Sequence, residues 1–152
     1  PAHSGPDNSV ANSGTHRRST MGILKWLGII AESEIEPVSL NDTNFSAEVR
    51  QSDIPVMVDV WSTGCGPCMQ LVPTIKRLAA KYKGEVKVAE LNAGQAPKTM
   101  RKLGVRSTPT VLFVKNGAIV ERVVGFRGQH YFEEIIEEEL LGRENAIQAE
   151  AV

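Results

Sequence analysis

One short segment, Trp61-Ser62-Thr63-Gly64-Cys65-Gly66-Pro67-Cys68, contains both cysteines of this 152-residue chain. Apolar and largely β-branched residues precede it over 55–61 and indicate a buried strand. Apolar residues at helical spacing follow it over 69–82 and indicate an amphipathic helix. The two cysteines therefore stand where a strand passes into a helix.

This position gives the two thiols different properties. Residues i and i+3 on a first helical turn lie side by side, so a disulfide forms between them without a large backbone movement. The unpaired N–H groups and the dipole of the helix N-terminus favour a thiolate at Cys65. Gly66 and Pro67 lie between the cysteines, and Pro67 suits a first turn because its missing N–H has no intrahelical partner to lose. We expect Cys65 to be the exposed, attacking thiol and Cys68 the covered, resolving one.

Other uses of a cysteine pair fit the sequence less well. A structural disulfide across so small a loop would constrain the unfolded chain little. A zinc site would need a second pair of Cys or His ligands, and the histidines are only His3, His16 and His130, without ligand spacing. A CxxC motif beside a β-α-β pattern is the redox signature. We therefore expect a redox-active disulfide, no metal and no separate cofactor.

Composition limits the classes of partner. The net charge is −1, which does not favour nucleic acid or an acidic membrane surface as the main partner. No apolar run is long enough to span a bilayer as a helix. The length suits one domain with extensions.

The first part of the chain differs in composition from the rest. Residues 1–20 are rich in Ser, Gly, Asn and Pro, which predicts a disordered leader. Because Met21 looks like a natural start, we expect an added expression leader, with a processed native N-terminus as the alternative. Residues 21–37 predict a short apolar helix and an acidic linker, with the helix docked on the domain. A membrane-surface or partner-binding helix over 21–31, or a weak export signal, is the alternative.

Further elements follow from residue patterns. We expect a short strand at 38–40 and then a helix that holds Phe45, Ala47 and Val49, for which the candidate N-caps are Asn41, Asp42 and Thr43. A strand over 86–91 and a helix over 97–103, started by Pro97 and stopped by Gly104, come next. Two strands at 110–115 and 118–124 flank Asn116-Gly117, which predicts a tight hairpin turn.

A last helix is predicted over 129–141. Its apolar face would hold Tyr131, Phe132, Ile135, Ile136 and Leu140. Its solvated face would hold Glu133, Glu134, Glu137 and Glu138. Residues 142–152 are expected to fray.

Several of these features together resemble the thioredoxin family. They are Asp59-Val60-Trp61, Cys65-Gly66-Pro67-Cys68, Thr108-Pro109-Thr110 and Asn116-Gly117, and the resemblance covers about 38–141. It implies an α/β thioredoxin fold with a central mixed five-stranded sheet flanked by helices on both faces. It also implies a thiol–disulfide oxidoreductase, specifically a protein-disulfide reductase that works through Cys65 and Cys68.

The resemblance assigns further residues to the site. Asp59 is a charge in an apolar strand, so burial should raise its pKa; the family role is proton acceptor for the resolving thiol, and a structural polar group is the alternative. The family holds the peptide bond before Pro109 cis, beside the cysteines, and Trp61 would pack there too. The positions that match the family's substrate-contact surface are Gly64, Ala93, Thr108, Gly125 and Phe126.

The chain departs from the family at two positions. Gly64 stands where the family has Trp directly before the first cysteine, which should flatten the recognition surface. Glu90 stands where a lysine usually lies near the buried aspartate. A second carboxylate there should raise the pKa of Asp59 rather than lower it.

The same resemblance implies partners and a setting. Substrates would be disulfide-containing proteins, and a thioredoxin reductase or a similar electron donor would re-reduce the pair, a role in electron transport and cell redox homeostasis. We expect a cytoplasmic monomer, with a periplasmic or membrane-associated protein as the alternative. Two other functions stay open: a disulfide oxidase or isomerase in an exported compartment, and a binding or scaffold protein that uses the thioredoxin fold.

Overall fold

A computed structural model describes residues 35–143 of the chain, and the predictions made for residues 1–34 and 144–152 lie outside this part. The elements are β1 (Val38–Leu40), η2 (Ser46–Arg50), β2 (Val56–Trp61), α2 (Gly66–Lys81), β3 (Lys87–Asn92), α3 (Pro97–Leu103), β4 (Thr110–Lys115), β5 (Ala118–Val124), α4 (Gln129–Ile135) and η3 (Ile136–Leu140).

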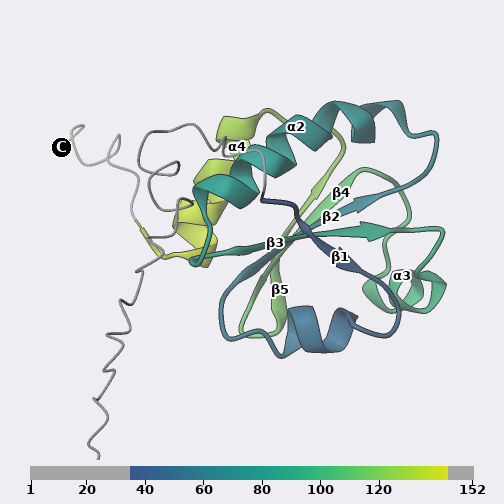
Figure 1. The fold of residues 1–152 in the computed structure, drawn as a ribbon, viewed down its shortest axis with the longest axis horizontal. Coiled ribbons are helices and arrows are strands. Elements are labelled where there is room, and N and C mark those ends of the chain that lie inside the picture. Colours follow the sequence, from purple (N-terminus) through teal and green to yellow (C-terminus); the bar gives the residue numbers. More distant parts are fainter. Residues whose placement is uncertain (1–34, 144–152) are drawn as a thin grey trace, which may run out of the picture. The chain divides into compact units, whose positions relative to one another are not determined.

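The strands form one mixed sheet with the order β1-β3-β2-β4-β5. Strands β1 and β2 run parallel to β3, whereas β4 is antiparallel to β2 and β5 is antiparallel to β4. Helices α2 and α4 cover one face of this sheet, and α3 and η2 cover the other (Figure 1). The five-stranded mixed sheet between two helical layers confirms the predicted fold class.

Alternation along β2 decides which side chains face α2. Successive residues of a strand point to opposite faces. Met57 packs in the cluster under α2, and Val58 packs in the cluster on the α3 side. The pattern places Asp59 on the same face as Met57, toward the helix that carries Cys68. The strand period thus places the carboxylate on the face of the sheet that α2 covers.

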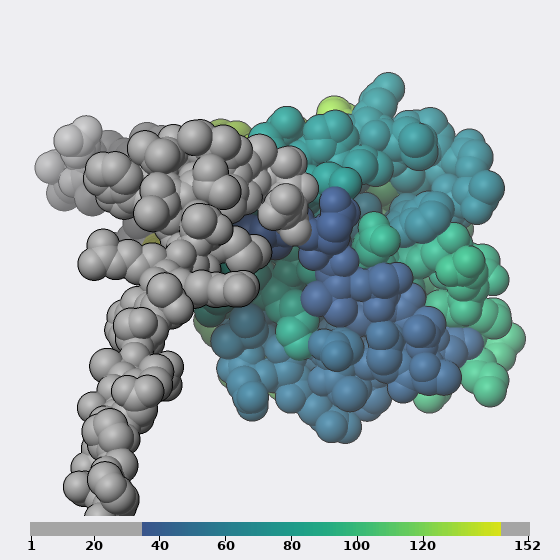
Figure 2. Space-filling view, in the orientation of Figure 1, coloured from purple at the N-terminus to yellow at the C-terminus, as the bar shows by residue number. Residues whose placement is uncertain are grey.

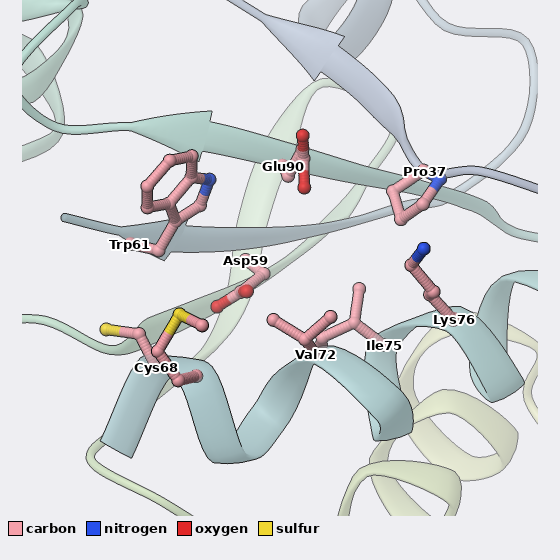
Figure 3. Close-up of a pocket in the computed structure, with 9 residues that line it drawn as sticks. Pro37, Asp59, Trp61, Cys68, Val72, Ile75, Lys76 and Glu90 are labelled. Carbon is pink, nitrogen blue, oxygen red and sulfur yellow. The ribbon is translucent and has the colours of Figure 1, made fainter. Parts of the chain in front are cut away.

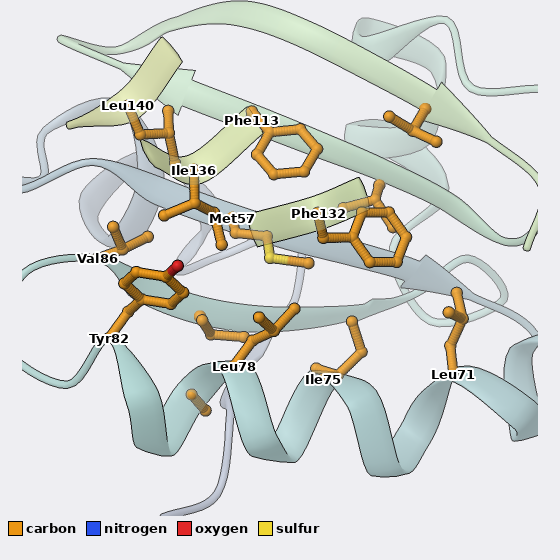
Figure 4. Packing of buried hydrophobic residues seen from close by; sticks show 14 residues of the cluster. Met57, Leu71, Ile75, Leu78, Tyr82, Val86, Phe113, Phe132, Ile136 and Leu140 are labelled. Atoms are coloured by element: carbon orange, nitrogen blue, oxygen red, sulfur yellow. The ribbon is translucent and has the colours of Figure 1, made fainter. Parts of the chain in front are cut away.

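The core under α2 is built from large apolar side chains on the helix, the sheet and the C-terminal helix (Figure 4). Leu71 and Leu78 of α2 are fully buried, as are Phe113 of β4 and Phe132 of α4. The rings of Phe113 and Phe132 lie 6.3 Å apart between centroids. Burying each such side chain is worth about 1.5–3 kcal/mol, so this layer fixes α2, and the cysteines at its start, against the sheet.

The hairpin turn matches its predicted chemistry. Asn116 and Gly117 have φ values of 52° and 76°, the left-handed pair that a two-residue hairpin turn requires. A Cβ at Gly117 would lie 2.6 Å from the carbonyl oxygen of Arg50, so a larger residue would also collide with the backbone.

The helix predicted after β1 is present as one short helical turn, η2, in which Val49 is buried and Ala47 is exposed. The Asn41 side chain caps this region, since it accepts hydrogen bonds from the N–H groups of Thr43 and Asn44. Asp42 is therefore wrong as a cap for its own segment. Its carboxylate caps α3 instead.

Asp42 is a long-range N-cap. Its two carboxylate oxygens accept hydrogen bonds from the N–H groups of Lys98 at 3.2 Å and Thr99 at 2.7 Å. The first N–H groups of a helix have no intrahelical partner, and Ala96, the local cap residue, supplies no side-chain acceptor. Sequence patterns assign caps to the nearest helix, which is why this role was missed.

The apolar and solvated faces of the C-terminal helix are less cleanly separated than predicted. Tyr131 is exposed, although it was assigned to the apolar face. Glu137 is half-buried and accepts a hydrogen bond from the Tyr82 hydroxyl at 2.8 Å, so the prediction that it is solvated is wrong. Glu133 is also half-buried and pairs with Lys81 at 3.0 Å. Carboxylates on this side bind Lys81 and Tyr82 at the end of α2. The sequence of the C-terminal helix by itself does not reveal these partners.

The first described residues lie on the outside of the sheet. In the space-filling view the β1 segment runs across the surface beside α2 (Figure 2). Ile35 packs against the core cluster under α2, and Glu36 pairs with Lys76 of α2 at 2.8 Å. At the other end, Arg143 binds Glu85 and Glu137, so the fraying predicted from residue 142 does not hold for Arg143. No helix within residues 35–143 is both long and apolar enough to cross a membrane.

Candidate active site

The two cysteines form a disulfide at the start of α2. Their sulfur atoms are 2.09 Å apart and their Cα atoms 5.3 Å apart. Cys65 is the N-cap residue, and its sulfur accepts a hydrogen bond from the Cys68 N–H at 3.2 Å. Cys65 is half-exposed, whereas the exposed fraction of Cys68 is 3%. The predicted difference in exposure between the two sulfurs is present.

A second loop is hydrogen-bonded to the cysteine loop. The hydroxyls of Ser62 and Thr108 are 2.7 Å apart. The Thr108–Pro109 peptide bond is cis, as the resemblance implied. The Pro109 carbonyl accepts a hydrogen bond from the Gly125 N–H at 2.8 Å. These contacts hold the start of β4 and the end of β5 beside the loop that carries Cys65. The bond between Ser62 and Thr108 was not predicted, because hydroxyl residues in loops carry no distinguishing pattern.

Behind the cysteines lies a small cavity between α2 and strands β2 and β3 (Figure 3). Its volume is about 140 Å³. It is lined by Pro37, Asp59, Trp61, Cys68, Met69, Val72, Ile75, Lys76 and Glu90. The inner thiol position and the strand carboxylate therefore share one mostly apolar space.

Asp59 is the buried charged group of this cavity. Its exposed fraction is 4%, and its Oδ1 atom accepts no hydrogen bond from residues 35–143. Burial raises the pKa of Asp59 to about 7, with a smaller contribution from the charge of Glu90. A carboxyl group with such a pKa can take up and release a proton near neutral pH.

Glu90 faces the same cavity because Asp59 and Glu90 are partners in the register of β2 and β3. Glu90 is less buried than Asp59, so we expect it to ionise first and its charge to oppose ionisation of Asp59. Burial and the charge of Glu36 raise the pKa of Glu90, and Lys76 opposes that shift.

Lys76 was missed by sequence reasoning. It lies on α2 across the cavity from Glu90 (Figure 3), and its ammonium is bound to Glu36. A usable signal existed, since Cys68, Val72 and Lys76 recur at a spacing of four residues and so share one helix stripe. The resemblance to the family pointed to the position of Glu90 on β3 for a lysine, whereas the cation of this cavity is on α2.

The residues predicted to contact substrate lie at one edge of the sheet. The Ala93 N–H donates to the Trp61 carbonyl at 2.8 Å, which places the β3 loop beside the end of β2. Thr108 and Gly125 adjoin Pro109 as described above, and the exposed fraction of Phe126 is 44%. Gly64 is exposed and has a φ of +78°, a conformation that strains residues with a Cβ. The local backbone therefore suits glycine at this departure from the family. Contact with substrate stays a prediction.

The described residues show no metal centre. Within 35–143, no group of three or more His, Cys, Asp or Glu side chains is placed to hold a metal ion.

Comparison with known proteins gives a consistent result. The sequence model of the thioredoxin family, described as "Thioredoxin", matches residues 36–138. Thioredoxin 2 of Chlorobaculum tepidum is 45% identical over 84 residues, which cover 55% of this chain and 77% of that protein. The thioredoxin of Haemophilus influenzae is 40% identical over 90 residues, covering 59% and 84%. The chloroplastic M-type thioredoxin of Pisum sativum is 43% identical over 95 residues, covering 62% and 54%.

Proposed function

Because this chain belongs to the thioredoxin family and is a thiol–disulfide oxidoreductase, we propose that it reduces protein disulfides, with Cys65 attacking, Cys68 resolving and Asp59 accepting the proton. The observation that carries the proposal is the unequal burial of the two cysteine residues. A substrate disulfide can approach the half-exposed Cys65, while Cys68 is enclosed beside Asp59.

The reaction balances in two exchanges. The Cys65 thiolate attacks one sulfur of the substrate disulfide, so a mixed disulfide forms and the other substrate sulfur leaves as a thiolate. The Cys68 thiolate then attacks the Cys65 sulfur, and the second substrate sulfur leaves. The substrate gains two electrons and two protons, and the protein ends as the Cys65–Cys68 disulfide seen in the structure.

The helix start supports the first exchange. When Cys65 is reduced, its sulfur stays at the N-cap, where the N–H of Cys68 and the helix dipole stabilise negative charge. Pro67 and Gly66 occupy the first turn and leave the sulfur accessible.

Asp59 supports the second exchange. It lines the same cavity as Cys68, and its Oδ1 atom has no hydrogen-bond donor within residues 35–143. With its pKa raised to about 7, ionised Asp59 can take the proton of the Cys68 thiol. A cavity of about 140 Å³ has room for a water molecule to carry that proton.

The family implies disulfide-containing protein substrates and a reductase as partner. For this chain we propose a thioredoxin reductase or a similar donor, a monomeric state and a cytoplasmic setting. The Gly66-Pro67 dipeptide matches the reducing members of the family, as the resemblance implies. We also propose that Trp61, Thr108 and Pro109 shape the surface on which the substrate lies.

The reduction potential of the Cys65–Cys68 pair tests the direction of the reaction. Equilibration with glutathione or dithiothreitol buffers, followed by alkylation and mass spectrometry, should give a reduction potential of about −270 mV. A value above about −180 mV would favour an oxidase or isomerase instead. A pair that does not exchange at all would favour the binding or scaffold function. The Cys65→Ser/Cys68→Ser double variant is the control for non-specific exchange.

A further inference from the structure

The connections that surround Cys65 carry no carboxylate. They are 62–65 after β2, 93–96 after β3, 104–109 before β4 and 125–128 after β5, and their sequence contains no Asp or Glu. Two arginines, Arg106 and Arg127, are their only charged residues. We call these four connections the redox loops. A chain with a net charge of −1 thus has a purely cationic set of loops around its reactive sulfur.

Contacts place these loops side by side. The Ser62 and Thr108 hydroxyls join the first loop to the third at 2.7 Å, and the bond from Gly125 N–H to the Pro109 carbonyl joins the third to the fourth. The hydrogen bond from the Ala93 N–H to the Trp61 carbonyl places the second loop, 93–96, beside the end of β2. The strand directions place them at the same end of the sheet, because β3 runs parallel to β2, β4 runs antiparallel to β2, and β5 runs antiparallel to β4.

Both arginines are available to a partner. Arg106 is exposed, two residues before Thr108, and Arg127 is exposed with its guanidinium against the Tyr131 ring, 5.9 Å from the ring centroid. Arg127 also donates to the Phe126 carbonyl at 2.8 Å. Neither arginine forms an ion pair with an acidic side chain of residues 35–143.

Acidic groups nearby are engaged elsewhere. Asp42 follows β1, the outer strand at this edge, and is bound to the backbone N–H groups of Lys98 and Thr99. Asp59 and Glu90 line the cavity behind Cys68 and belong to strands β2 and β3 rather than to the loops. These three carboxylates therefore form no ion pair with the arginines of the redox loops in residues 35–143.

We propose that the redox loops select protein disulfides whose flanking residues are acidic. The proposal rests on the reductase function above and adds the substrate class. Carboxylates beside a substrate disulfide would meet Arg106 in the loop before β4 and Arg127 in the loop after β5, the two loops that follow that of Cys65 in the sheet order. Arginine suits this role because its planar guanidinium binds carboxylates through paired hydrogen bonds. Complementary charge raises the rate of encounter and disfavours partners of the same sign.

The test compares peptides that differ only in charge. Each peptide has one intramolecular disulfide, with Glu, Gln or Lys at the same flanking positions, and its reduction by the full chain is followed under a fixed supply of dithiothreitol. We expect kcat/KM for the Glu peptide to exceed that for the Lys peptide by roughly three- to thirtyfold, as two exposed ion pairs allow. The ratio should shrink toward one at about 0.5 M salt, because exposed charges are screened there.

Variants assign the preference to residues. In the Arg106→Gln/Arg127→Gln double variant the ratio of Glu to Lys peptide rates should fall to near one. Lys83→Gln, which removes an exposed cation just after the C-terminal end of α2, should leave the ratio as it is in the unchanged protein.

The possible failures are distinguishable. If no peptide is reduced, including the Gln peptide, the reductase function is wrong. If all three are reduced at equal rates, or the Lys peptide is preferred, the function stands and the acidic selectivity is overturned. A preference that survives in the double arginine variant would also overturn the assignment.

Discussion

Asp59 and Glu90 are paired across the parallel strands β2 and β3, and both side chains line the cavity beneath the inner cysteine. Two carboxylates are thus held beside one poorly solvated space. A second charge there is costly. The cation among the residues that line the cavity is Lys76, and it is bound to Glu36. The proton affinity of Asp59 is the property that this arrangement sets.

Replacing Glu90 by lysine should lower the pKa of Asp59 below its present value of about 7, because a repelling charge becomes an attracting one. The pKa should stay above 3.8, since burial is the larger cause and is unchanged. The pH profile of disulfide reduction should shift toward acid. Carboxyl-carbon NMR titration of the reduced and oxidised protein measures the first effect, with both carboxylates fitted as a coupled pair.

Glu121→Lys provides the matched control for Glu90→Lys. It makes the same change of charge on β5, the outer strand at the other side of the sheet, and should leave the Asp59 titration where it is. If Asp59 titrates like a free aspartate in the unchanged protein and in both variants, it has no place in the mechanism.

The stability of the oxidised protein should depend on pH through Asp59. The pKa of this group is higher in the folded state, about 7, than its ordinary value of 3.8, so the folded state holds the proton over that interval while the unfolded state releases it. This contribution to the free energy of unfolding is complete below about pH 4, falls as pH rises and is lost above about pH 7. For Asp59 alone it is on the order of 4 kcal/mol.

Asp59→Asn tests that dependence. Urea unfolding between pH 4 and pH 8 should show a markedly smaller loss of free energy of unfolding than in the unchanged protein. Asp53→Asn, at an exposed site before β2, should keep the full dependence. An unchanged pH slope in Asp59→Asn would show that Asp59 is already ionised in the folded state.

Much of the fold followed from sequence because its signals are local. The apolar, largely β-branched run of β2 and the residues Pro97 and Gly104 that start and stop α3 are signals between neighbouring residues, and the structure has the buried strand and the helix where they predict them. The Asn116-Gly117 turn is local in the same sense. The positions of Cys65 and Cys68 on the first turn of α2 follow from the same reasoning.

Three of the failures involve contacts between distant segments. Asp42 caps a helix more than fifty residues away in the chain, with separations of 56 and 57 residues. Glu137 meets the Tyr82 hydroxyl across a separation of 55 residues. Periodicity places Lys76 on the same helix stripe as Cys68 and Val72, but it does not show which strand that stripe faces. The pairing of α2 with β3 depends on tertiary packing.

The chain should fold and keep its activity when it begins at Ile35. All strands of the sheet lie after this residue, and Ile35 itself packs on the core. A chain that begins at Val38 should still fold but lose about 1–3 kcal/mol in free energy of unfolding, because the Ile35 packing and the Glu36–Lys76 pair are removed. Chemical unfolding followed by tryptophan fluorescence measures both. Loss of folding on removal of residues 1–34 would show that the apolar segment 21–31 belongs to the core.

The division of labour between the two thiols is the central claim, and trapping tests it most directly. The reduced Cys68→Ser variant, mixed with a disulfide-containing protein, should accumulate a mixed disulfide at Cys65, because attack remains and resolution is lost. Cys65→Ser should neither reduce the substrate nor accumulate an adduct, since Cys68 is buried. Peptide mapping of the adducts by mass spectrometry decides the matter. An adduct that forms as fast on Cys68 in Cys65→Ser as on Cys65 in Cys68→Ser would contradict the account.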